Sequence, residues 1–161
     1  MKPLIYQIFT RLYGNKKHAN IPAGSIEENG CAKMNDITAK QLERIASMGF
    51  THVWFTGLIE HATQTDYSAY DIKPDHPAVV KGRAGSPYAI KDYYDIDPDL
   101  AVNVKQRMKE FNALLKRTHQ AGLKLVIDFV PNHVARQYNS DAHPKGVKDL
   151  GEGDDTTKAF D

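Results

Sequence analysis

The sequence predicts an α/β fold built on a parallel sheet, and three observations lead to this prediction. Apolar stretches typical of strands alternate with amphipathic stretches typical of helices, in the order strand, helix, strand, long loop, helix, strand. The last of these strands, residues 123–130, is almost wholly apolar and rich in β-branched residues, as in parallel strands covered on both faces. Polar residues follow it directly, and in α/β folds the carboxyl ends of strands carry the functional groups.

The first half of this order can be justified element by element. Residues 4–13 are dense in aromatic and β-branched side chains and predict a strand that ends at Gly14. Residues 15–35 contain Pro22 and further glycines, which is typical of a loop. Asp36 or Thr38 can cap a helix whose apolar residues recur at helical spacing and which stops at Gly49. The second strand is predicted over residues 50–58.

The second half contains the long loop. Residues 57–102 include four prolines and show no sustained period, and they predict a functional loop, because loops beyond about 12–15 residues are uncommon in compact domains. A helix is predicted over residues 103–121, with Gly122 as its stop. Pro131 has no backbone N–H to donate a hydrogen bond within a sheet, so the third strand is expected to end near Val130. Residues 135–161 are polar and predict no regular element.

Composition excludes several classes of partner. The 161 residues carry 21 Lys and Arg against 20 Asp and Glu without a block of like charge, so neither nucleic acid nor a membrane is expected as a partner. No apolar run approaches the about 18–20 residues that span a bilayer. The single cysteine, Cys31, excludes an internal disulfide and a cysteine-rich zinc site, and its expected role is packing.

The start of the chain reads as a strand and not as a signal peptide, because no small-residue cleavage site follows its short apolar patch. The sequence therefore leaves the localisation open: the chain as written would be cytoplasmic, and it would be periplasmic or secreted if a signal was removed from a longer precursor.

Asp128 and His133 form the most informative pair. A carboxylate inside an apolar strand costs several kcal/mol to desolvate unless it is paired, so Asp128 must have a partner. Both side chains can point at a ligand above the strand end; alternatively, Asp128 holds loop amides and His133 lies at the surface. Tyr88, whose approach Pro87 stiffens, can stack on a sugar ring or plug the loop onto the core. Trp54 is expected in the core.

A metal site is a further alternative. His52 and His61 flank the second strand and could join Asp128 and His133, since several barrel hydrolases bind metal through His and Asp at strand ends. No compact ligand motif supports this arrangement. The chain also has no glycine-rich phosphate loop between a strand and a helix, which argues against nucleotide binding.

Several segments resemble the α-amylase superfamily of glycoside hydrolases. Residues 126–134, Val-Ile-Asp-Phe-Val-Pro-Asn-His-Val, are similar to its first signature region, with Asp128, Asn132 and His133 at the family's relative positions. Residues 88–93, Tyr-Ala-Ile-Lys-Asp-Tyr, resemble a family segment that normally reads Tyr-Asp-(apolar)-x-Asp-Tyr. The segments Ile-Tyr-Gln-Ile-Phe-Thr-Arg and Thr-His-Val-Trp-Phe-Thr-Gly are similar to the first two barrel strands. The resemblance covers about residues 4–134.

This resemblance implies a partial TIM (β/α)8 barrel: the first three βα strands, a long loop after the second, and the start of an inserted second domain. Residues 1–134 would belong to the catalytic barrel and residues 135–161 to the inserted domain. A complete barrel needs roughly 250 residues. Three strands leave open sheet edges, through which self-association is possible.

The resemblance also implies roles for individual residues. Tyr88 would stack under the glucosyl ring at the cleavage point, His133 would bond its 6-hydroxyl, and Asp128 would support the site from beneath, paired with an arginine of the fourth strand. Asn132 resembles an asparagine that ligates a structural calcium in many members; no organic cofactor is implied. Ala89 stands where many members carry aspartate, so the contacts of that carboxylate are missing.

The implied function is that of part of a retaining α-glucoside hydrolase acting on starch-like α-glucans or maltooligosaccharides. The family's nucleophile and acid lie on the fourth and fifth strands, and therefore beyond Asp161, so the 161-residue chain is expected to bind substrate and to be inactive alone. Two alternatives remain. One is a non-catalytic carbohydrate-binding or ancillary relative of the same fold, and the other is a metal-dependent TIM-barrel hydrolase.

Overall fold

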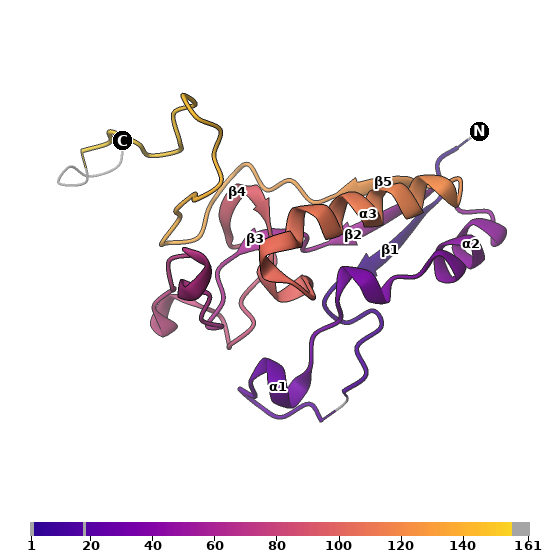
Figure 1. Ribbon diagram of the computed structural model, residues 1–161, viewed down its shortest axis with the longest axis horizontal. Coiled ribbons are helices and arrows are strands. Elements are labelled where there is room, and N and C mark those ends of the chain that lie inside the picture. The colour runs from indigo at the N-terminus through magenta and orange to yellow at the C-terminus, as the bar shows by residue number, and fades with distance from the viewer. Residues whose placement is uncertain (1, 18, 156–161) are drawn as a thin grey trace.

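The computed structural model describes residues 2–17 and 19–155, and its centre is a three-stranded parallel sheet (Figure 1). The strands are β1 (Ile5–Phe9), β2 (His52–Thr56) and β5 (Lys124–Ile127), in the order β1-β2-β5. Their register aligns the last residues of β1 and β2, Phe9 and Thr56. The three strands expected from the sequence are confirmed. Each is shorter than its apolar stretch, and β5 ends at Ile127 and not near Val130.

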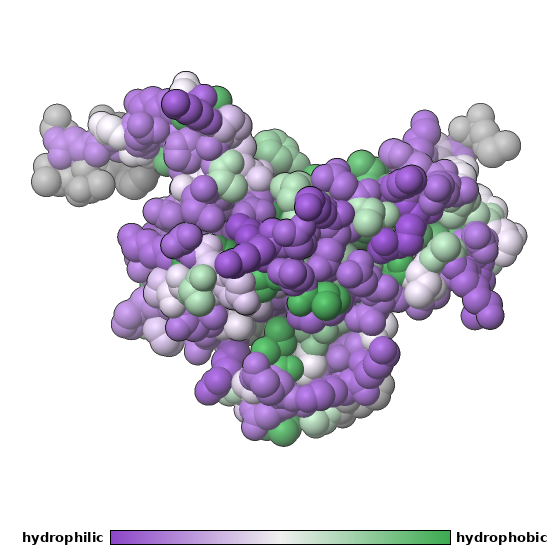
Figure 2. Space-filling view, viewed as in Figure 1, coloured by the Kyte–Doolittle hydropathy of each residue, from purple (hydrophilic) through white to green (hydrophobic). Residues whose placement is uncertain are grey.

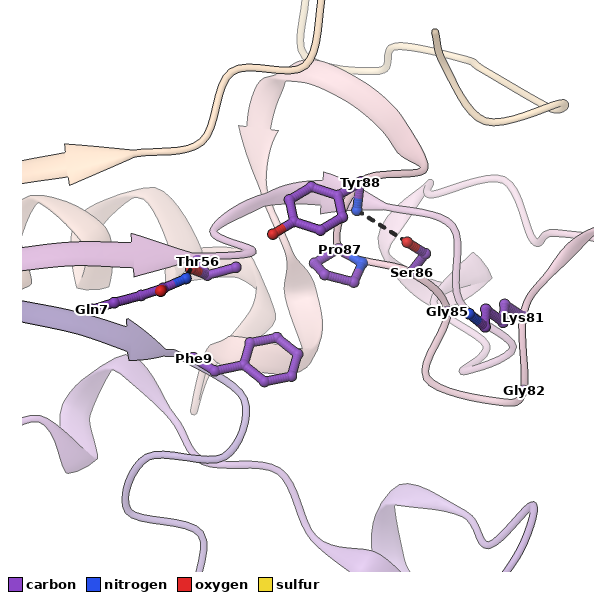
Figure 3. Close-up of a pocket in the computed structure, with 9 residues that line it drawn as sticks. All are labelled: Gln7, Phe9, Thr56, Lys81, Gly82, Gly85, Ser86, Pro87 and Tyr88. Atoms are coloured by element: carbon purple, nitrogen blue, oxygen red, sulfur yellow. Dashed lines mark hydrogen bonds between the residues drawn. The ribbon is translucent and has the colours of Figure 1, made fainter.

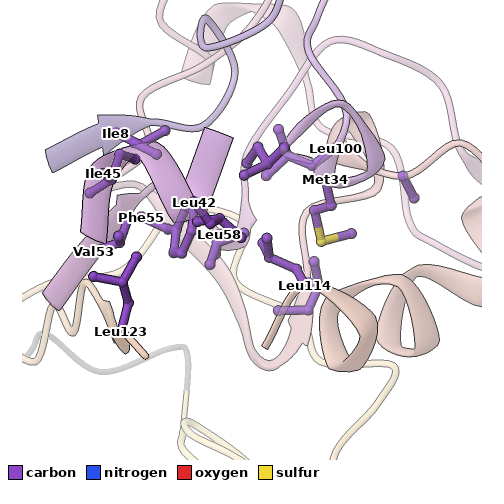
Figure 4. Packing of buried hydrophobic residues seen from close by; sticks show 13 residues of the cluster. Ile8, Met34, Leu42, Ile45, Val53, Phe55, Leu58, Leu100, Leu114 and Leu123 are labelled. Atoms are coloured by element: carbon purple, nitrogen blue, oxygen red, sulfur yellow. The ribbon is translucent and has the colours of Figure 1, made fainter. Parts of the chain in front are cut away.

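Two helices, α2 (Ala39–Ser47) and α3 (Arg107–Gln120), cover one face of this sheet, as Figure 1 shows for α3. Thr38 caps α2: its hydroxyl accepts from the backbone N of Gln41 at 3.4 Å, and the Gln41 side chain accepts from the backbone N of Thr38 at 2.7 Å. Both helices were predicted. Cys31 packs against the core between the helices and the sheet. Figure 4 shows the buried members of this core, which include Ile8, Leu42, Ile45, Val53, Phe55, Leu114 and Leu123.

The other face of the sheet is open in the described residues, which corrects the expectation of strands covered on both faces. Side chains alternate along β1: Ile8 is 1% exposed, whereas Ile5 and Phe9 are 50% and 40% exposed. Both helices pack on the side of Ile8, so neither covers Ile5 and Phe9.

A second sheet corrects the expectation of an unstructured loop over residues 57–102. Strand β3 (Ile59–His61) pairs antiparallel with β4 (Ile90–Ile96). The β4 sequence did not read as a strand because Lys91, Asp92 and Asp95 interrupt its apolar residues. These charged side chains are nevertheless buried, since each has a partner elsewhere: Arg107 Nε, for example, donates to Asp95 Oδ2 at 2.8 Å.

The remaining elements are short. Helix α1 (Ile26–Asn29) is a single capped turn within the predicted loop 15–35. The 3₁₀ turns are Met34–Asp36, Ser68–Tyr70, Pro77–Val79, Pro98–Leu100 and Val104–Gln106. Among the described residues after β5, none is in a helix or strand, as expected. This segment passes along the β3–β4 sheet, where Ala135 N donates to Ile90 O at 2.7 Å.

The outer surface is mostly polar over the face drawn in Figure 2, and apolar side chains show there only as small patches. Within residues 2–17 and 19–155, no helix combines the length and apolar content that crossing a membrane requires.

Candidate functional site

A cleft of about 990 Å³ lies at the carboxyl ends of β1 and β2 (Figure 3). Phe9 and Thr56, the last residues of these strands, form one wall together with Gln7, whose Nε2 donates to Thr56 Oγ1 at 2.9 Å. The segment 81–88 forms the facing wall through Lys81, Gly82, Gly85, Ser86, Pro87 and Tyr88. The cleft thus occupies the position where α/β folds place their functional groups, and its size suits an organic ligand.

Tyr88 lies in this cleft with its ring directed toward the strand ends (Figure 3), and it is 42% exposed. The side chain does not plug the loop onto the core, which was the alternative for this residue. Its backbone N donates to Ser86 Oγ at 3.3 Å. Pro87 packs on Gly57, where an added Cβ would be 2.9 Å from Pro87 Cβ and where φ is +78°, so the close approach requires glycine.

Asp128 is half-buried just beyond β5 and has two partners on β2 and its turn. Its Oδ1 accepts from Trp54 Nε1 at 2.7 Å, and its Oδ2 accepts from the backbone N of Gly57 at 2.9 Å. The expectation that this carboxylate is held by hydrogen bonds is confirmed. Because Gly57 is also the residue on which Pro87 packs, Asp128 supports the turn beneath the cleft wall that carries Tyr88. Trp54, expected in the core, is a half-buried donor to this carboxylate.

His133 and Asn132 lie on the exposed loop after β5. Nδ1 of His133 is 3.0 Å from Oδ1 of Asn132, and the loop is held by the Tyr93 hydroxyl, which donates to the backbone oxygens of Val130 and His133. None of these contacts reaches Tyr88 or Asp128. Contacts through Gly57 therefore connect Tyr88 and Asp128, whereas His133 stands apart from them.

The histidines of the alternative metal site do not come together. His52 begins β2, at the opposite end of the strand from the cleft, and its Nδ1 is 2.7 Å from Thr51 Oγ1. His61 is buried at the end of β3, with Nδ1 at 2.6 Å from Asp97 Oδ2. In the part of the chain that the structure describes, no group of three His, Cys, Asp or Glu side chains close enough to share a metal ion includes either histidine or His133.

A buried ionic network holds the cleft wall from behind. His61 pairs with Asp97, and Arg11 Nη2 lies 2.5 Å from Asp99 Oδ2. His61 Nε2 and Arg11 Nη2 also lie 3.3 Å and 3.5 Å from the backbone oxygen of Ala84, within the wall segment. No local sequence pattern points to this network, because its members are up to 88 residues apart.

The charges of this network shift its pKa values in opposite directions. Burial lowers the pKa of His61, but the Asp97 carboxylate more than reverses this, so the pKa of His61 lies above its usual value. Burial raises the pKa of Asp97, but His61 and Arg11 outweigh burial and hold that pKa below its usual value. Each partner therefore favours the charged form of the other.

Calcium at Asn132 can be tested against the same contacts. An amide oxygen is a suitable ligand for this hard cation, but calcium takes about six to eight oxygens. Asn132 is exposed, and its Oδ1 contacts His133. Asn132 Oδ1 would supply one such oxygen, so a calcium ion there would need several further ligands.

Comparison with known proteins places these features in a family. The family model "Alpha amylase, catalytic domain" matches residues 7–150. A cyclomaltodextrin glucanotransferase of Bacillus sp. (strain 38-2) is 24% identical over 147 residues, which cover 86% of this chain and 19% of that protein. An amino acid transporter heavy chain of Rattus norvegicus is 44% identical over 57 residues, 35% of this chain and 7% of that protein.

Among solved structures, an alpha-amylase from Lactobacillus plantarum superposes with a TM-score of 0.56 and 28% identity, over 84% of this chain and 24% of that chain. The chain spans about a fifth of the length of the glucanotransferase and about a quarter of that amylase. Residues 7–150, which the family model matches, include all the residues that line the cleft.

Proposed function

This chain belongs to the alpha-amylase catalytic-domain family, and on that premise we propose that it supplies part of the substrate-binding surface of a retaining α-glucoside hydrolase. The substrates proposed are starch-like α-glucans or maltooligosaccharides. The resemblance noted in the sequence is confirmed at the level of the family. A fragment of a TIM barrel follows from the same match.

The observation that carries this proposal is the exposed Tyr88 ring in the cleft at the strand ends. A sugar ring has an apolar face that stacks on an aromatic ring, and its hydroxyls need polar partners at the rim. Thr56 and Gln7 line the cleft opposite Tyr88 and can provide such partners. Asp128 supports this arrangement through Gly57. His133 is proposed to reach the 6-hydroxyl of the sugar from the loop after β5.

The bond-breaking carboxylates are proposed to come from outside the described residues. A retaining glycosidase needs a nucleophile and an acid about 5–5.5 Å apart across the scissile bond. None of the described residues that line the cleft is Asp or Glu. We therefore propose that the 161-residue chain binds sugar without cleaving it. Hydrolysis of starch by the purified chain, measured by release of reducing ends, would contradict this.

Sugar binding is tested by calorimetric titration of the chain with maltoheptaose. Tyr88→Ala is expected to weaken binding about tenfold, equivalent to about 1.4 kcal/mol, because the stacking surface is lost. Tyr94→Ala is the matched control: this ring is 37% exposed, is not part of the cleft, and should leave the affinity unchanged. Equal affinities of the two variants, or no binding by the unmodified chain, would refute the proposed site.

Calcium at Asn132 remains a proposal that depends on ligands beyond the described residues. Its test is calcium content of a protein that includes the following strands, before and after Asn132→Ala. Unchanged content would remove Asn132 as a ligand.

A second candidate function is an ancillary relative of the same fold without catalysis. The similarity to an amino acid transporter heavy chain, 44% identity over 57 residues, supports this second candidate. One measurement separates the two functions. A protein that extends through the fifth barrel strand and beyond should hydrolyse maltooligosaccharides if it is a hydrolase, and should bind them without turnover if it is an ancillary relative.

A further inference from the structure

Three carboxylates from separate segments meet away from the cleft. Glu60 on β3 and Asp92 on β4 are aligned across the antiparallel pair, and Asp141 approaches from the segment after β5. One carboxylate oxygen from each lies within 4.8 Å of the other two. Like charges facing each other across a strand pair repel, so this arrangement needs a compensating partner.

Glu60 is the side chain that lacks this partner. It is 1% exposed, and neither of its carboxylate oxygens accepts a hydrogen bond within the described residues. A buried carboxylate without a hydrogen bond or a counter-charge is strongly unfavourable, and it must bind either a proton or a cation. Burial and the carboxylates of Asp141 and Asp97 raise the pKa of Glu60 to about 9 when no cation is bound.

The neighbouring cationic side chains are directed to other carboxylates. Lys91 Nζ lies 3.1 Å from Asp75 Oδ2. Arg107 pairs with Asp95 and lies 3.6 Å from Asp141 Oδ2. Both side chains attract the charge of Glu60, but neither forms an ion pair with it, so its carboxylate has no direct cationic partner among the described residues.

We propose that Glu60, Asp92 and Asp141 bind a hard divalent cation of the calcium class. Calcium–oxygen distances of about 2.3–2.6 Å allow oxygens that lie within 4.8 Å of one another to share one ion. Magnesium is usually held by one or two carboxylates and keeps several of its waters, so a site of three carboxylates favours calcium. Asp141 is exposed, so water can complete the coordination.

The surrounding contacts orient this site. Asp92 Oδ2 accepts from Ser140 Oγ at 2.8 Å and from the backbone N of Asp141 at 3.0 Å, which brings the Asp141 carboxylate to the β3–β4 sheet. A bound cation would join β3, β4 and the segment after β5. None of the three carboxylates lines the cleft, so this site is distinct from the substrate site. It does not include Asn132, so it is also distinct from the calcium site that the family resemblance implies.

The test is calcium binding by the whole chain after chelator treatment, measured by calorimetric titration with CaCl₂. One calcium per chain is expected. Glu60→Gln and Asp141→Asn should each weaken binding at least tenfold, because each removes a charged ligand. Glu43→Gln, an exposed carboxylate of α2, is the matched control and should bind calcium as the unmodified chain does.

Glutamine keeps the shape of a protonated glutamate, and Asp141 is at the surface, so both variants are expected to fold; circular dichroism checks this. The melting temperature should rise with calcium in the unmodified chain and stay constant in Glu60→Gln. Absence of calcium binding by the unmodified chain would overturn the proposal and leave a protonated Glu60. Binding that survives both Glu60→Gln and Asp141→Asn would overturn it as well.

Discussion

Replacing Asp128 by alanine should loosen the cleft and destabilise the chain. The substitution removes the acceptor of two donors, Trp54 Nε1 at 2.7 Å and the backbone N of Gly57 at 2.9 Å. A hydrogen bond to a charged group contributes about 1.5–3 kcal/mol, and water can reach a half-buried site, so the lower end of this range applies. Two such bonds predict a loss of about 3 kcal/mol in the free energy of unfolding.

Trp54 makes this prediction measurable, because it is the single tryptophan of the chain. Urea unfolding followed by its fluorescence gives the change in stability, and one indole N–H resonance reports the hydrogen bond in the folded state. Asp128→Ala should shift that resonance and increase its exchange with water. Asp154→Ala, at an exposed turn remote from β2, is the control and should change neither.

The same variant should also weaken maltoheptaose binding, since Gly57 is the residue on which Pro87, next to Tyr88, packs. A stability loss below about 1 kcal/mol together with an unchanged indole resonance would refute the reasoning, because both donors would then have found other acceptors.

The remaining predictions concern the wall, the ionic network and the sheet edges. Gly85→Ala should cost at least about 3 kcal/mol in urea unfolding, because the new Cβ would be 1.7 Å from the Ala62 oxygen at φ +75°, whereas Gly82→Ala, with open space around it, should cost about 1 kcal/mol. The His61–Asp97 pair should stabilise the fold between the unfolded pKa of Asp, about 4, and the raised folded pKa of His61. The contribution of this pair should disappear as pH rises through the folded pKa of His61 or falls below about 4. If the urea midpoint of His61→Gln depended on pH as strongly as that of the unmodified chain, this prediction would be wrong. The open edges of β1 and β5 should let chains associate at high concentration, which sedimentation velocity detects and which a monomer at all concentrations would exclude.

The strands and helices that the sequence predicts correctly are those that local patterns specify. Apolar, β-branched stretches and helical spacing indicate β1, β2, β5, α2 and α3, and Thr38 marks the start of α2. The antiparallel pair of β3 and β4 was not predicted, because Lys91, Asp92 and Asp95 are typical of surface residues. Their burial depends on partners distant in sequence, which periodicity does not contain.

The candidate site divides in the same way. Tyr88 and Asp128 were identified from local motifs, and the need of Asp128 for a partner followed from the cost of burying its charge. The identity of that partner, Trp54, and the unpaired state of Glu60 depend on which strands become neighbours. The expectation of strands covered on both faces was wrong for a related reason, because coverage depends on where the helices pack, and α2 and α3 both pack on the side of Ile8.

The hydrogen bond between Asp128 and Gly57 has a consequence for the order of events on the ribosome. Gly57 is synthesised 71 residues before its acceptor, so β1 and β2 can meet while the turn beneath the sugar-facing wall is still unsupported. At about 5–20 residues per second, this interval lasts about 4–14 seconds. The binding wall therefore matures only after β5 has emerged and docked, although most of its residues were translated earlier.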